Sequence, residues 1–156
     1  MNRQHGIATA FIAFLASAIA LLVSGAAVAS DSYLCIADLS TGFSFNKDTG
    51  EWHRANFAAG EKYVLSKAKE GGWVVREMGQ EHPLLRCPGD FNAGNNLICS
   101  DGINDFRMNR HLLRYLKAFL IGYYVDYSDL RGLPGIPEMK EGGDTPELEI
   151  GKCTPI

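Results

Sequence analysis

The chain has 156 residues, of which 46% are hydrophobic and 21% are charged, and its formal net charge is −3. This length corresponds to one domain and excludes a multi-domain enzyme. The slightly acidic net charge excludes a general nucleic-acid binder. The chain has a single long apolar segment, which excludes a polytopic membrane protein.

The first 29 residues predict a secretory signal peptide. A short basic start precedes an apolar run over 6–23, and Ala27-Val28-Ala29 supplies the small residues that signal peptidase recognises. Residues 1–29 hold one of the 15 Lys and Arg residues and none of the 18 acids, so cleavage leaves a formal charge of −4. We therefore expect residues 30–156 to form one periplasmic or secreted domain, with no integral membrane span after cleavage.

Between residues 31 and 100, short apolar or alternating segments are separated by glycine-rich turns at intervals of about ten residues. Their length and composition are typical of β-strands. The strands are predicted at 33–37, 43–45, 52–57, 62–65, 73–76, 84–87 and 97–99. With a closing strand at 147–153, they predict an all-β domain, an antiparallel meander closed as a small barrel or folded as a sandwich.

The segment 108–124 has two interpretations. Apolar residues at helical spacing predict one short helix near 108–121, whereas alternation at period two predicts strands. An internal comparison favours a hairpin, because aligning Phe43 with Phe106 without gaps also aligns Asn46 with Asn109 and Trp52 with Tyr115. The first copy contains Asp48-Thr49-Gly50, which is typical of a turn. If the two copies have the same structure, both are hairpins.

An acidic loop rich in Pro and Gly is predicted at about 126–146. Seven acids lie in 126–149 against two basic residues, with prolines at 134, 137 and 146. Such composition indicates irregular structure, and this is expected to be the longest loop of the domain.

The four cysteines, Cys35, Cys87, Cys99 and Cys153, predict two disulfides, because an exported chain with an even number of cysteines usually pairs them. Three pairings are possible. We favour Cys87–Cys99, which closes a short loop of turn-forming residues, and Cys35–Cys153, which ties the first strand to the last. The chain has no C-x-x-C pair and no histidine pair at ligand spacing, so neither a metal site nor a cofactor is predicted.

The combination Phe106-Arg107-Met108-Asn109, then Gly122-Tyr123, Asp144-Thr145-Pro146 and Ile150-Gly151-Lys152-Cys153 resembles a group of small exported proteobacterial proteins of uncharacterised function. The resemblance extends over most of the mature chain. It implies a mostly β, disulfide-bearing periplasmic or secreted domain, and its motifs transfer no catalytic residue.

A cluster of basic residues suggests a binding surface. Clustered charge steers encounter with an oppositely charged partner, and aromatic side chains are frequent binding anchors. The candidate binding residues are Arg107, Arg110, His111, Arg114, Tyr123 and Tyr124. An envelope protein or an anionic polymer is the expected partner, and nucleic acid is not expected. The alternative is that the charges form one solvated strand face beside the acidic loop.

The sequence contains no nucleophile elbow, P-loop or zinc-protease motif, so no catalytic residue is predicted and a non-enzyme is favoured. The predicted function is an exported cell-envelope binding or inhibitor-type module. The alternative is a small periplasmic hydrolase or ligand-carrying barrel that uses His53 or His111 with nearby carboxylates.

Overall fold

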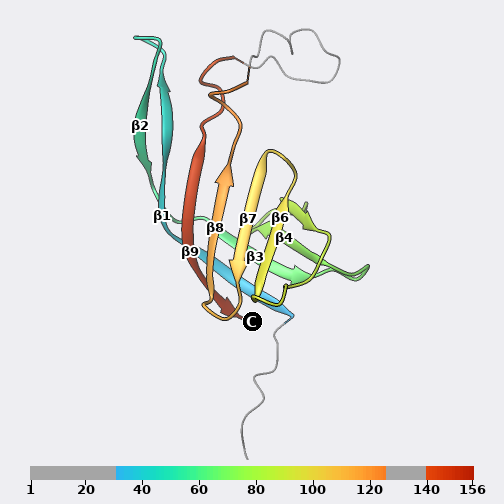
Figure 1. Cartoon of the computed structure of the whole chain (residues 1–156). Helices are drawn as coiled ribbons and strands as arrows, with labels where there is room; N and C mark the ends of the chain where they lie inside the picture. Colours follow the sequence, from blue (N-terminus) through green and yellow to red (C-terminus); the bar gives the residue numbers. More distant parts are fainter. Residues whose placement is uncertain (1–30, 126–139) are drawn as a thin grey trace, which may run out of the picture.

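A computed structural model of the chain describes residues 31–125 and 140–156 (Figure 1). The predicted signal peptide (1–29) and most of the predicted acidic loop (126–139) lie outside the described residues. The described part is all-β, and every strand pair is antiparallel. Its strands are β1 (Ser32–Asn46), β2 (Glu51–Phe57), β3 (Lys62–Lys67), β4 (Trp73–Glu77), β5 (Leu85–Cys87), β6 (Asn96–Ser100), β7 (Asn104–Asn109), β8 (Arg114–Phe119) and β9 (Glu147–Pro155).

The strands form one sheet that is nearly closed into a barrel, which decides between the two predicted architectures. The hydrogen-bonded order is β5-β4-β3-β1-β9-β8-β7-β6, with β2 paired to β1 beside this path. The two end strands, β5 and β6, meet without a hydrogen-bonded ladder in the described residues, and the Cys87–Cys99 disulfide joins them. The short disulfide therefore cross-links the two strands where the barrel closes, in addition to the loop 88–95 that connects them along the chain.

The long disulfide joins the neighbouring strands β1 and β9. Cys35 and Cys153 are directly opposite each other in the register of these strands. Both predicted pairings are confirmed. The predicted closing strand at 147–153 is also confirmed as β9, which lies between β1 and β8.

Strand β1 is longer than predicted, since the segments 33–37 and 43–45 are parts of one continuous strand. Its register against β9 shifts between Ala37 and Leu39, which marks a bulge at Asp38. Before the bulge β1 pairs with β3, and after it β1 pairs with β2. The second half of β1 and β2 thus form a hairpin that extends beyond the barrel wall (Figure 1).

Gly42, which separates the predicted strands 33–37 and 43–45, lies inside β1 rather than in a turn. A Cβ atom at this position would lie 2.0 Å from the carbonyl oxygen of Pro146. Glycine is therefore needed here for the close approach of β9 and its preceding residue rather than for a turn.

The segment 106–124 contains a β-hairpin, so the alternative of a short helix near 108–121 is wrong. The internal comparison succeeds because the two hairpin turns use the same local chemistry. Asn46 Oδ1 accepts hydrogen bonds from the backbone N–H groups two and three residues further on, and Asn109 Oδ1 does the same. Each turn then ends in a left-handed residue, Gly50 at φ 73° in the first copy and Leu113 at φ 52° in the second.

The barrel interior is packed with aromatic side chains and the two disulfides. Phe106 stacks on Tyr115 with ring centroids 5.2 Å apart, and Tyr63 contacts both rings edge-on at 5.9 Å. These rings are almost fully buried, and aromatic burial of this kind contributes a large part of the stability of a small domain. The interior of this barrel is thus a packed core.

Candidate functional site: an aromatic cleft

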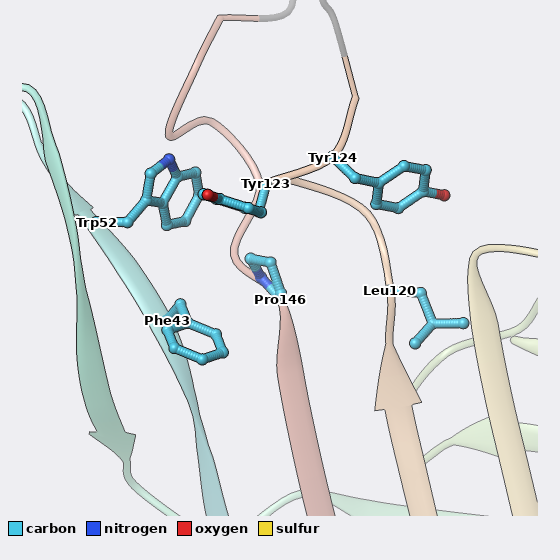
Figure 2. Close-up of a pocket in the computed structure, with 6 residues that line it drawn as sticks. All are labelled: Phe43, Trp52, Leu120, Tyr123, Tyr124 and Pro146. Carbon is cyan, nitrogen blue, oxygen red and sulfur yellow. The ribbon is translucent and has the colours of Figure 1, made fainter.

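An open cleft of about 550 Å³ lies on the outer face of the sheet, where the β1–β2 hairpin meets the ends of two other strands (Figure 2). It is built by the β1–β2 hairpin and by two segments that are far from this hairpin in the sequence. Strands β1 and β2 supply one wall, and the residues after β8 and before β9 supply the other. Its lining residues are Phe43, Trp52, Leu120, Tyr123, Tyr124 and Pro146.

Backbone contacts hold the two walls together. The N–H of Phe43 donates to the carbonyl oxygen of Pro146 at 3.1 Å, which joins the hairpin to the start of β9. Gly122 has φ 133°, and a Cβ atom there would lie 2.7 Å from Cδ of Pro146. Glycine therefore lets the chain after β8 turn closely over Pro146, and this turn places Tyr123 and Tyr124 at the cleft.

Two of the aromatic rings that line the cleft contact each other, and the lining rings remain partly open to solvent. Trp52 packs against Phe45 at 5.4 Å on its own hairpin and meets Tyr123 edge-on at 5.8 Å across the cleft. The exposed fraction is 53% for Phe43, 71% for Tyr123 and 69% for Tyr124. In Figure 2 the Tyr123 side chain points towards Trp52, and the Tyr124 side chain points away from it. Much apolar surface thus remains available to a partner.

A second hollow of about 700 Å³ is lined by other residues of β1, β2 and β9, among them Leu39, Leu148 and Ile150. Leu39, Thr41 and Phe43 follow one another at every second position of β1, and Leu148 and Ile150 do so on β9. Since alternate residues of a strand share a face, these side chains form one apolar stripe on the outside of the sheet. Exposed apolar surface of this kind is uncommon on a monomer unless it takes part in binding.

The predicted basic residues lie elsewhere. Arg107 is held by Asp105 through two hydrogen bonds of 2.7 and 3.0 Å. Arg110 donates to Asn95 Oδ1 at 2.9 Å and lies over the Phe91 ring at 5.0 Å, so it stabilises a neighbouring loop. His111 is in the β7–β8 turn, and Arg114 begins β8.

Strand β8 runs from Arg114 to Phe119, and Tyr123 and Tyr124 follow its other end. The structure therefore does not bring the two tyrosines together with the basic side chains of the β7–β8 turn. Arg107 and Arg110 already have partners, and the binding role predicted for the basic cluster stays a prediction.

The two histidines of the alternative hypothesis are also apart. His53 is exposed on β2, and His111 is exposed in the β7–β8 turn. Among residues 31–125 and 140–156, no group of three or more His, Cys, Asp or Glu side chains is arranged to hold a metal ion. These same ranges contain no helix long and apolar enough to cross a membrane.

A polar cluster lies at the inner face of the barrel, where β8 and β9 pair. Tyr115 donates its hydroxyl hydrogen to Glu149 Oε1 at 2.7 Å, and Glu149 is only 1% exposed. Burial, the hydrogen bond to Glu149 and the negative charge of Glu149 raise the pKa of Tyr115. Burial, followed by the charge of Glu149, also raises the pKa of Tyr63, whose ring lies 5.3 Å from Lys117 Nζ. The folded protein therefore favours both phenols in the neutral form.

Sequence reasoning identified Tyr123 and Tyr124 but missed Phe43, Trp52, Leu120 and Pro146. A signal for two of them was present in the first hairpin, where Phe43, Phe45 and Trp52 occupy one face once the turn at 47–50 is placed. Nothing local in the sequence could place the residues after β8 beside this hairpin. Comparison of the chain with protein-family models, curated proteins and solved structures finds no match.

Proposed function

We propose that this chain is an exported binding module of the cell envelope and that the aromatic cleft is its binding site. The observation that carries the proposal is the set of partly exposed aromatic side chains around a 550 Å³ hollow on a cross-linked barrel. Aromatic residues that keep their surface in water while held on a rigid frame bind with little loss of conformational entropy.

Export is supported by the predicted signal peptide and by the two disulfides. Disulfides form and persist in the periplasm and outside the cell, whereas cytosolic thiols are kept reduced. Cleavage after Ala29 would give a mature chain that starts at Ser30, which intact-mass measurement of the exported protein tests directly.

The cleft is a stronger candidate for recognition than the basic cluster. Arg107 and Arg110 already have partners inside the molecule, so using them for an anionic polymer would mean giving up those contacts. Phe43, Tyr123 and Tyr124 have no such conflict, because their exposed surface gains by removal from water, at roughly 25 cal/mol per Å².

Site-specific photocrosslinking in the producing cells tests the proposal. A benzophenone amino acid replaces Tyr124 in one strain and Met78, an exposed apolar residue of the β4–β5 connection, in a matched control. We expect a discrete covalent adduct from position 124, its loss when Trp52→Ala is added, and none from position 78. Equal labelling from both positions, or no adduct from 124, would overturn the proposal.

A further inference from the structure

Strand β2 has an open edge. It pairs with β1 on one side, and no strand in the described ranges pairs with it on the other. The β3–β4 ladder does not extend along β2, because its last hydrogen bond joins Met78 N to Lys62 O, at the start of β3. The hairpin therefore stands clear of the barrel with one edge unpaired (Figure 1).

The register shows which backbone groups face this open edge. The N–H of Phe43 donates to Pro146, so the N–H and C=O of Phe43 point towards β9. Because these directions alternate along an antiparallel strand, Gly42 and Ser44 point towards β2, where they pair with Ala55 and His53. The backbone groups of Trp52, Arg54 and Asn56 must then point outward, away from β1.

Side chains of these same three residues lie on the outer face of the hairpin, since Trp52 and Arg54 are directly opposite Phe45 and Phe43. Trp52 thus belongs both to the open edge and to the aromatic cleft. Arg54 is exposed, and no carboxylate pairs with it among the residues that the structure describes. The edge therefore offers backbone hydrogen bonds, an apolar ring and an exposed positive charge in one row.

We propose that β2 binds an extended polypeptide segment as an added antiparallel strand, with an apolar side chain opposite Trp52 and an acidic side chain opposite Arg54. This inference rests on the proposed function and names its partner class. Alternating N–H and C=O groups at strand spacing are matched by another extended backbone, and a glycan or lipid has no such repeat. The indole N–H of Trp52 already donates to Glu141 Oε1 at 3.3 Å, which leaves the cleft itself without a ring N–H for sugar hydroxyls.

Natural edge strands are often protected by charge, and Arg54 fits this pattern against self-association. Two copies that paired antiparallel about Arg54 would place the two guanidinium groups opposite each other, where like charges are destabilising. A partner with an acidic residue at this position gains an ion pair instead. The charge therefore favours a different polypeptide over a second copy of this chain.

The test uses the mature, oxidised protein and a capped, fluorescein-labelled heptapeptide rich in threonine, with a glutamate followed two residues later by phenylalanine. Fluorescence anisotropy gives its Kd. Arg54→Thr removes the charge and keeps the edge, and we expect several-fold weaker binding. Arg54→Pro also removes the backbone N–H that points outward but keeps every hydrogen bond between β2 and β1, and we expect at least tenfold weaker binding. His53→Thr, on the opposite face of β2, is the matched control and should bind like the wild type.

A second measurement keeps the test independent of whether Arg54→Pro folds. The same peptide with its alternate amides N-methylated cannot form the ladder and should bind at least tenfold more weakly to the wild type. The inference fails if the peptide does not bind, or if N-methylation or Arg54→Pro leaves its Kd unchanged. It also fails if the wild-type protein forms a dimer that excludes the peptide and that Arg54→Pro dissociates. Photocrosslinks from position 124 to a glycan or lipid would overturn the inference while leaving the proposed binding function intact.

Discussion

The two disulfides are expected to contribute to stability in different ways, because only one of them lies inside a hydrogen-bonded ladder. Cys35 and Cys153 are opposed residues of β1 and β9, and 118 positions separate them in the sequence. Cys87 and Cys99 join β5 and β6 where the barrel closes, and only 12 positions separate them. Removing each bridge therefore tests a different property of the fold.

The magnitudes follow from the lengths of the two closed loops. In the chain-entropy treatment, a bridge across about 118 residues stabilises by roughly 5 kcal/mol and one across about 12 residues by roughly 3 kcal/mol. All four cysteines are buried, so the double alanine variants lose similar sulfur packing. C35A/C153A should thus be less stable than C87A/C99A by about 2 kcal/mol.

The local effect should have the opposite order. In C35A/C153A the backbone hydrogen bonds of β1 and β9 still fix the register, whereas in C87A/C99A only the loop 88–95 connects β5 to β6, with no ladder between them in the described residues. The amide hydrogens of β5 and β6 should then exchange faster at low denaturant, through opening of the barrel edge rather than global unfolding.

Urea unfolding followed by fluorescence measures the global difference, and hydrogen exchange with mass spectrometry measures the local one. The reasoning is refuted if C87A/C99A proves the less stable variant, or if its β5 and β6 peptides exchange no faster than those of the wild type. The first result would mean that the short disulfide contributes more to stability than its loop length predicts, and the second would mean that side-chain packing closes the barrel without it.

Three further outcomes are expected. Gly151→Ala should destabilise the fold by about 2–4 kcal/mol, because its Cβ would lie 2.1 Å from a β1 carbonyl oxygen and 2.5 Å from Tyr115. Thermal unfolding measures this, with Gly89→Ala as the control because the space around Gly89 is open. Equal melting temperatures of the two variants would contradict the prediction. Gly50→Ala should cost about 1 kcal/mol and Gly50→Asn less, since asparagine tolerates φ 73°; equal urea midpoints would argue against a left-handed turn. Above pH 10 the phenols of Tyr63 and Tyr115 ionise in the unfolded chain but stay neutral in the folded protein, so the free energy of unfolding should fall by up to about 2.7 kcal/mol per pH unit. In Tyr63→Phe it should fall by half as much. Urea midpoints between pH 8 and 11.5 measure this slope, and a slope that the variant leaves unchanged would disprove the raised pKa of Tyr63.

The features of the fold that local chemistry determines could be predicted from the sequence. The hairpin at β7–β8 followed from comparison with the Asp48-Thr49-Gly50 turn, because Asn46 and Asn109 cap their turns in the same way. The Cys87–Cys99 pairing followed from a short loop of turn residues. Closure as a barrel rather than a sandwich could not be predicted, since it depends on strands β5 and β6 meeting at the ends of the sheet.

The cleft was harder to predict for the same reason. The basic residues are neighbours in sequence and were grouped on that basis, but strand alternation and local partners separate them. Arg107 is paired within its own strand to Asp105, and Arg110 contacts Phe91. By contrast, Trp52 and Tyr123 are 71 positions apart in the sequence and meet at 5.8 Å because β1 and β8 flank β9. Such contacts follow from the strand order, which no local pattern specifies.

The strand order also explains why the cleft is better interpreted as a recognition surface than as part of the core. The barrel already has a packed interior around Tyr63, Phe106 and Tyr115, closed by two disulfides. The β1–β2 hairpin extends past this core, so the rings that it carries add little burial to folding while remaining exposed to solvent. An apolar surface that folding does not bury lowers solubility unless a partner covers it. The hairpin edge and its aromatic cleft are thus the part of the molecule whose composition the proposed binding function would explain.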